Sequence, residues 1–72
     1  AQVSGEVDQV FTEMGRTASI EAATELAKKR TVLAGADSAT LSVVEVEDLP
    51  LSYVPGDALR VRVRVVGDTA PN

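Results

Sequence analysis

Cysteine, histidine and tryptophan are absent from this 72-residue sequence, which holds a single tyrosine and a single phenylalanine. Without cysteine the chain can form no disulfide and no thiolate metal site. Without histidine it lacks the commonest metal ligand and the commonest general base, which excludes nucleophile–histidine catalysis within the chain. The scarcity of aromatic rings also removes the stacking platforms on which proteins bind single-stranded nucleic acids.

Positive charge and long apolar runs are scarce as well. The formal net charge is −4, which disfavours nucleic acid as a partner because phosphate affinity depends on lysine and arginine. No apolar run approaches the ~20 residues of a membrane span, and residues 1–10 do not have the pattern of a signal peptide. With no cysteine present, we expect a cytoplasmic protein. The absence of an initiating methionine suggests a processed or excised chain.

The stretch "SIEAATELAKKRTVLAGAD" predicts an amphipathic helix with Thr17 or Ser19 as N-cap and Gly35 just beyond its C-terminus. At 100° per residue one continuous arc is apolar. Its members are Ile20, Ala22, Ala23, Leu26, Ala27, Leu33 and Ala34. The opposite side holds polar residues, namely Glu21, Thr24, Glu25, Lys28, Lys29 and Thr31. Arg30 falls inside the apolar arc, where its stem can lie along the core with its head in water. The alanines make this face flat enough for a sheet to approach closely.

The C-terminal half is rich in valine and predicts a hairpin with a loop around Pro55-Gly56. If Val54 lies opposite Asp57, counting outward places Val46 opposite Val65. Valines then line one face of both strands, which would pack against the helix.

The segment "RVRVRV" places Arg60, Arg62 and Arg64 together on the other face. In the same register this face also carries Glu45 and Glu47, with Glu47 opposite Arg64. We therefore interpret it as a solvated strand face with cross-strand ion pairs. Binding of phosphate by the arginines is the alternative.

Part of the hairpin does not fit this register. Asp48 would point inward, while Leu49 and Leu51 would point outward. A bulge near Glu47-Asp48 would return the leucines to the core. Leu41 and Val43, nearer the start of the strand, also fall on the arginine side and could be covered by something outside this chain. The candidate interface residues are thus Leu41, Val43, Leu49, Leu51, Arg60, Arg62 and Arg64.

The N-terminal stretch "EVDQVFTEMG" could form a strand or a short helix. We favour a strand with Val7 and either Val10 or Phe11 facing inward, because a third strand would support an otherwise marginal hairpin. The resulting fold class is α+β: a small two-layer β-α-β-β domain, with one helix packed on a three-stranded, mainly antiparallel sheet. We place the last strand between the other two.

No catalytic, cofactor-binding or metal-binding residue is predicted. Glu45, Glu47 and Asp48 resemble a metal cluster, but hard cations need several oxygens converging from a shaped loop. With arginines opposite, ion pairing is the favoured interpretation. Tyr53 is interpreted as an amphipathic anchor rather than a ligand contact. The glycines form no phosphate-cradling motif.

Three stretches, "AQVSGEVDQVF", "AGAD" and "VVEVEDLPLSYVPGDALRVRVRVVGD", resemble the C-terminal segment of hydantoinase/oxoprolinase-family proteins of the N-methylhydantoinase A-like kind. The most specific part is residues 50–56 followed by the Arg/Val strand. Asp57 stands where the family pattern has asparagine. The resemblance covers almost the whole chain.

This resemblance implies that residues 1–72 are a single domain, an excised C-terminal module of a larger ATP-dependent hydrolase of five-membered cyclic amides. ATP and a divalent metal would bind only in an actin-like ATPase core upstream, whose phosphate motifs are not in this sequence. The expected function is therefore a non-catalytic structural or assembly module with that core as its partner. The alternatives are a homo-oligomerisation module and weak binding of anions or nucleic acid through Arg60, Arg62 and Arg64.

Overall fold

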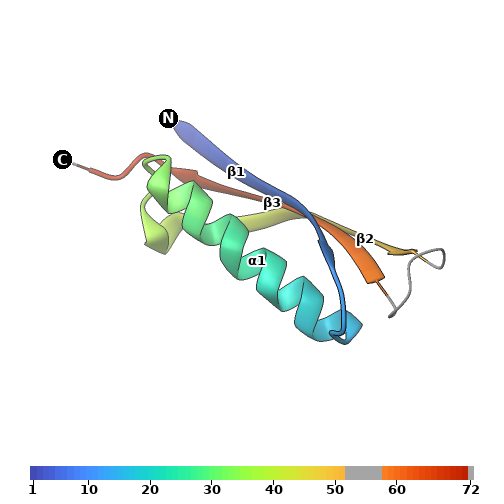
Figure 1. The fold of residues 1–72 in the computed structure, drawn as a ribbon. Coiled ribbons are helices and arrows are strands. Elements are labelled where there is room, and N and C mark those ends of the chain that lie inside the picture. The colour runs from blue at the N-terminus through green and yellow to red at the C-terminus, as the bar shows by residue number, and fades with distance from the viewer. Residues whose placement is uncertain (52–57, 72) are drawn as a thin grey trace.

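A computed structural model, which describes residues 1–51 and 58–71, shows one helix packed on a three-stranded sheet (Figure 1). The elements in chain order are β1 (Gln2–Phe11), α1 (Arg16–Leu33), the short 3-10 helix η1 (Ser38–Thr40), β2 (Ser42–Leu51) and β3 (Ala58–Asp68). The β-α-β-β order and the α+β fold class are therefore confirmed. The N-terminal stretch is a strand, as favoured.

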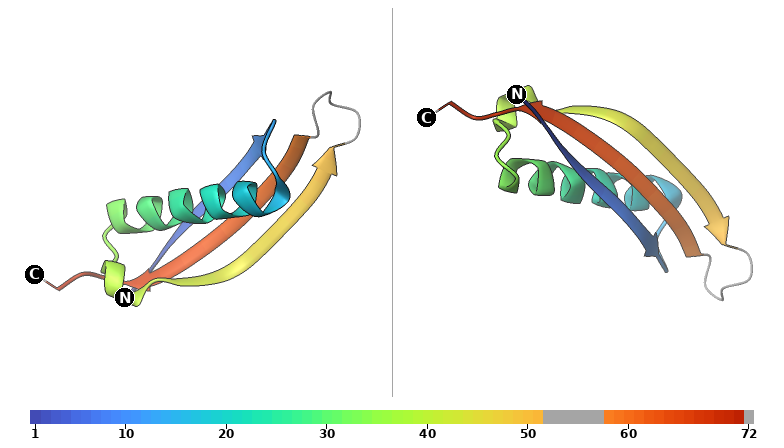
Figure 2. Two further views of the ribbon diagram at one scale, coloured as in Figure 1. Left: turned by 90° about the horizontal axis from the view of Figure 1, so that it is seen from below. Right: turned by 90° about the horizontal axis from the view of Figure 1, so that it is seen from above.

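The last strand, β3, lies between β1 and β2 and is antiparallel to both. This confirms the predicted strand order. Both β1 and β2 are therefore edge strands of the described sheet. Figure 2 shows α1 crossing one face of the sheet, with β2 as the strand farthest from the helix.

The pairing of β2 with β3 differs from the prediction by two residues. Val46 lies opposite Val63 rather than Val65, and Glu47 lies opposite Arg62 rather than Arg64. A shift of two residues leaves the side chains of β2 from Glu45 onward on their predicted faces, because strand side chains alternate with a period of two. The predicted turn and Tyr53 fall within residues 52–57, outside the described residues.

The prediction of a bulge near Glu47-Asp48 was wrong, because the register of β2 shifts between Val43 and Glu45 instead. The extra residue reverses the face of everything that precedes it in β2. Val43 therefore lies opposite Val65, on the helix side of the sheet, and not on the arginine side as predicted.

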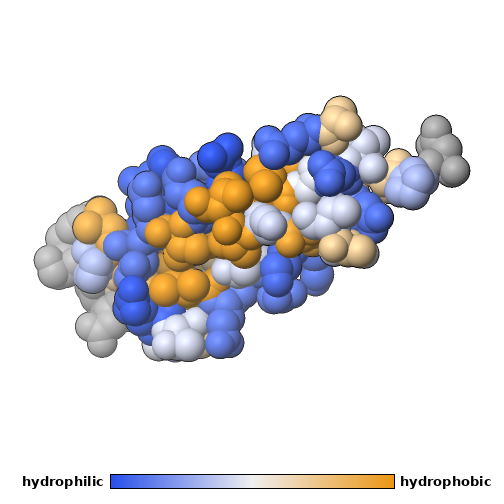
Figure 3. Space-filling model, turned by 180° about the vertical axis from the view of Figure 1, so that it is seen from behind, coloured by the Kyte–Doolittle hydropathy of each residue, from blue (hydrophilic) through white to orange (hydrophobic). Residues whose placement is uncertain are grey.

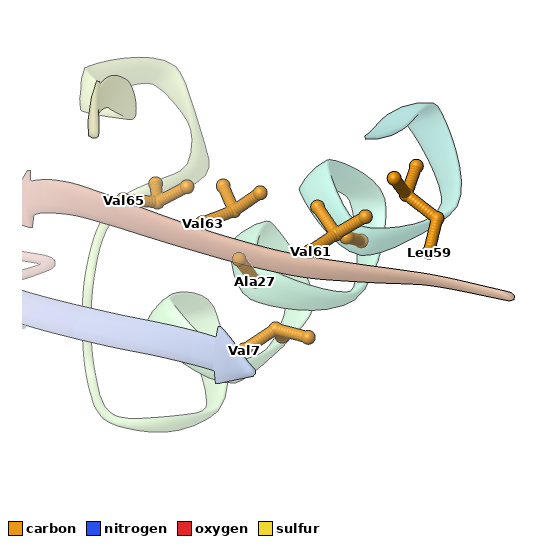
Figure 4. Close-up of a cluster of buried hydrophobic side chains, with 7 residues drawn as sticks. Val7, Ala27, Leu59, Val61, Val63 and Val65 are labelled. Carbon is orange, nitrogen blue, oxygen red and sulfur yellow. The ribbon is translucent and has the colours of Figure 1, made fainter. Parts of the chain in front are cut away.

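The core lies between α1 and the valine face of β3. Val61, Val63 and Val65 have no solvent exposure and cluster with Val7 of β1 and Ala27 of α1. Figure 4 shows these valine side chains projecting from the same side of β3. The predicted role of the valine face is confirmed.

The helix approaches the sheet through a stripe of small residues. The stripe repeats every fourth residue and consists of Ser19, Ala23, Ala27 and Thr31. Gly5 of β1 lies directly beneath its end: a Cβ at that position would lie 2.4 Å from the Oγ1 atom of Thr31. The Thr31 hydroxyl donates a hydrogen bond to the Ala27 carbonyl oxygen at 2.7 Å. Burial therefore leaves this polar group satisfied.

Three predictions for the helix faces were wrong. Thr31, expected on the polar side, is buried, whereas Leu33 and Ala34, expected in the core, are exposed, Leu33 to 86%. Because Gly5 has no side chain, Thr31 fits against β1. Leu33, two residues further along the helix, then points away from the sheet. Arg30 is exposed as expected, and its Nη1 atom donates to the carbonyl oxygen of Glu6 at 3.1 Å.

The helix ends as predicted but begins earlier. Gly35 follows the C-cap with φ of 113° and donates to the Val32 carbonyl oxygen, while Ala36 donates to that of Thr31. These two bonds form a Schellman motif, which favours glycine for its positive φ. The N-cap is Gly15, without a side-chain hydrogen bond, and neither of the predicted N-cap residues holds that position.

Candidate functional site

The arginine face of the sheet is a network of ion pairs. Arg60 forms a two-pronged contact with Asp8 of β1, from Nε to Oδ1 at 2.8 Å and from Nη2 to Oδ2 at 2.6 Å. This hydrogen-bonded guanidinium lowers the pKa of the Asp8 carboxyl below its ordinary value. The predicted exposure of the arginines beside acidic residues is confirmed here, although the acid comes from β1.

Arg62 is the centre of the network. Its Nη2 atom lies 2.7 Å from Glu45 Oε1 and 3.4 Å from Glu47 Oε1, and its Nε atom lies 3.8 Å from Glu6 Oε1. Hydrogen bonding to Arg62 lowers the pKa of Glu45. The Nε atom of Arg62 is buried and has no hydrogen-bond partner. Glu45 and Glu47 thus act as ion-pair partners of an arginine, as interpreted from the sequence.

The charge balance of this face disfavours anion binding. Arg64 is exposed, and among residues 1–51 and 58–71 it has no carboxylate within ion-pair distance. Around the three arginines stand four carboxylates, those of Glu6, Asp8, Glu45 and Glu47. A phosphate would have to displace these partners from Arg60 and Arg62, so these two arginines do not form a free cationic strip.

A further ion pair lies on the opposite face and was not predicted. Asp48 points to the helix side, as the register required, and accepts hydrogen bonds from Arg16 Nε at 2.6 Å and Nη2 at 3.1 Å. The Arg16 guanidinium lowers the pKa of the Asp48 carboxyl. The contact joins the first residue of α1 to β2. Its partners are too far apart in the sequence for any local pattern to connect them.

The four apolar candidates for an interface divide into three groups. Leu41 packs against the core from the helix side, and Leu51 is buried at the end of β2. Leu49 is 56% exposed on the arginine face, opposite Arg60. Val43 is exposed on the helix side. The bulge explains why Leu41 and Val43 are not beside the arginines. An interface role for these residues remains a prediction.

The largest departure from a closed core lies along β2. Three of its valines, Val43, Val44 and Val46, are 42%, 48% and 45% exposed. The helix lies over β1 and β3 and barely reaches β2, as the views from above and below show (Figure 2). Figure 3 shows the side on which β2 lies, with a band of hydrophobic surface between hydrophilic margins. Val43 and Val46, opposite the buried Val65 and Val63, therefore leave an uncovered apolar surface on the helix side of the sheet, and Val44 is the extra residue of the bulge.

A shallow depression adjoins this surface at the C-terminal end of α1. Val32, Leu33 and Leu41 form its apolar lining, and Lys28 and Lys29 stand at its border. Leu33 and Val32 are exposed here. The helical periodicity predicted Leu33 in the core, so this surface was not expected from the sequence.

No family model, curated protein or solved structure matches the chain in our comparisons. The described residues include no helix with the length and apolar character needed to cross a membrane. Nor does the described part of the chain contain a group of three acidic side chains arranged to hold a metal ion.

Proposed function

We propose that the chain is a non-catalytic packing module: the C-terminal structural or assembly domain of an ATP-dependent hydantoinase/oxoprolinase-type hydrolase. The observation that carries this proposal is the uncovered helix side of β2. Val43 and Val46 stand about half exposed opposite the fully buried Val65 and Val63 of β3. A contiguous apolar surface of this kind marks a place where another body packs.

The ionisable groups support a structural role. The pKa values of Asp8, Glu45 and Asp48 are all lowered, each by a hydrogen-bonded arginine. A general acid or base works best with a pKa close to the operating pH. Carboxylates held in ion pairs with lowered pKa values are poorly suited to that work.

The likeness of the chain to the C-terminal segment of hydantoinase/oxoprolinase-family proteins motivates the choice of parent. In this proposal residues 1–72 form one domain, and ATP, a divalent metal and the cyclic amide bind in an upstream core. The cytoplasm is the proposed compartment, in keeping with a chain that has no cysteine.

The test compares the isolated chain with the protein encoded by its complete reading frame. We expect ATP-dependent hydrolysis of hydantoin or 5-oxoproline by the complete protein and none by the isolated chain. We also expect amides of β2 to exchange hydrogen more slowly in the complete protein, because a neighbouring body covers them. Amides of β3, already central in the sheet, serve as the internal control.

Two results would overturn the proposal. Hydrolysis by the isolated chain would show that it is catalytic. Equal exchange rates for β2 in both proteins would show that nothing packs there.

Homo-oligomerisation is the second candidate, because both outer strands of the described sheet are open edges. Edge strands carry unpaired backbone groups that can pair with another chain. Light scattering over a range of concentrations tests it. A mass that stays at 7.5 kDa at the highest concentration counts against it.

A further inference from the structure

The free edge of β2 has a defined usable length. The bulge between Val43 and Glu45 interrupts regular pairing at one end. Pro50 has no N–H to donate at the other end. The five residues Glu45–Leu49 between these two points offer a regular edge to which an extended segment could add.

The two faces of this edge present different side chains to an added strand. On the arginine face, Glu45 and Glu47 alternate along β2, and the Glu47 side chain is 62% exposed. Both glutamates also contact Arg62, and the exposed Leu49 follows them on the same face. On the helix side, Val46 is 45% exposed, and the neighbouring Asp48 is paired with Arg16. Side chains directly opposite one another on adjacent strands interact, so an added strand meets Glu45 and Glu47 on one face and Val46 on the other.

The charge distribution argues against a second copy of this chain as the added strand. Both outer strands are acidic on this face, with Glu6 and Asp8 on β1 and Glu45 and Glu47 on β2. An antiparallel pair of β2 strands centred on Val46 would set Glu45 opposite Glu47 of the copy. Like charges directly opposite destabilise strand pairing. Addition of β1 from a copy would also bring carboxylates together.

We infer that Glu45–Leu49 of β2 accepts an extended segment of the partner protein, with lysine or arginine on the arginine face and apolar residues on the helix side. This inference rests on the proposed function and specifies how the partner binds. The segment continues the sheet by one strand. Its cations stand over Glu45 and Glu47, and its apolar side chains extend the layer begun by Val46.

The test uses the 72-residue chain and two short synthetic peptides, one alternating lysine with valine and the other alternating glutamate with valine. Amide chemical shifts locate binding, and fluorescence anisotropy measures its strength at low and high salt. We expect the lysine peptide to shift and protect amides of Glu45–Leu49. The glutamate peptide should bind at least about ten-fold more weakly, because two cross-strand charge pairs become repulsive. Added salt should weaken the lysine peptide only.

Protein variants supply the matched control. The double change Glu45→Gln and Glu47→Gln should weaken the lysine peptide about ten-fold. Glu21→Gln with Glu25→Gln makes the same change of net charge on α1 and should leave binding within about two-fold. The peptide charge swap needs no change to the protein, so it remains informative if a variant folds poorly.

Three results would overturn the inference: no shift in β2 amides at millimolar peptide, equal binding of both peptides, or self-association through β2 without peptide. Its failure can be told apart from failure of the proposed function. If β2 is protected in the complete protein but the lysine peptide does not bind, a different element covers the strand and the packing module stands. If β2 is unprotected there, the module itself is refuted.

Discussion

The close approach of α1 to β1 at Gly5 makes Gly5→Ala a sharp test of the fold. A Cβ at position 5 would lie 2.4 Å from Thr31 Oγ1, 2.8 Å from Thr31 N and 3.1 Å from the Ala27 carbonyl oxygen. Two of these neighbours are backbone atoms, so rotation of a side chain cannot relieve the clash. The C-terminal half of α1 would have to move away from β1.

The expected cost follows from two opposing effects. Overpacking of a well-packed interior costs about 1–3 kcal/mol, and a clash with backbone belongs at about 3 kcal/mol. Replacing glycine restricts the unfolded chain and returns about 0.7 kcal/mol. We therefore expect a net loss of about 2 kcal/mol. A domain of this size has a free energy of unfolding of about 4–11 kcal/mol, so the loss is a large share of the total.

Urea unfolding followed by circular dichroism measures this loss. Gly15→Ala is the matched control, because a Cβ there meets nothing within 4 Å. Alanine is less favourable than glycine at this N-cap by about 0.5–1 kcal/mol, and the restriction of the unfolded chain roughly offsets this, so the net change should be less than about 0.5 kcal/mol. Thr31→Ala removes the nearest atom but leaves both backbone contacts, so it should relieve only part of the Gly5→Ala penalty, by about 1 kcal/mol in a double-mutant cycle. A Gly5→Ala chain as stable as the Gly15→Ala chain would refute the close approach.

Three further predictions use other parts of the structure. Val63→Ala should lower the free energy of unfolding by about 2–3 kcal/mol because this side chain is fully buried. Val46 lies directly opposite and is about half exposed, so Val46→Ala should lower it by less than about 1 kcal/mol, and urea unfolding compares the two variants. Leu33→Ser should leave the unfolding midpoint within error of the parent chain, since this leucine is already in solvent; a marked loss would return it to the core. Stability should fall in acid, because the lowered pKa values of Asp8 and Asp48 mean that the unfolded chain takes up protons first. The contribution is complete above the ordinary pKa of 3.8 and is lost as the pH falls through the lowered folded values, so unfolding measured across an acid pH series should decline less steeply for Asp8→Asn.

Alternation in the sequence predicted what each strand shows to each face. The period of two in "RVRVRV" placed the valines inside and the arginines outside, and an error of two residues in the register did not disturb this. Gly35 likewise predicted the end of α1, because its positive φ is a local requirement. Features fixed by local geometry could therefore be predicted from the sequence.

Features fixed by contacts between distant residues could not be predicted in this way. The burial of Thr31 depends on the missing side chain of Gly5, and helical periodicity contains no information about that strand. The pairing of Arg16 with Asp48 joins residues on separate elements. The bulge between Val43 and Glu45 has no glycine to mark it, and its position decides whether Val43 lies beside the arginines or on the helix side.

The uncovered surface of β2 follows from simple dimensions. Three strands spaced by ~4.8 Å make a layer about 14 Å wide, whereas a helix with its side chains is about 10 Å across, so one helix covers about two strands. The contact between Gly5 and Thr31 anchors α1 over β1 and β3 and so decides that β2 is left out. Within this chain α1 cannot slide over Val46 without giving up that contact and exposing the β1 side of the core. The valines of β2 can therefore be buried only by a surface that another molecule, or another part of the same protein, supplies.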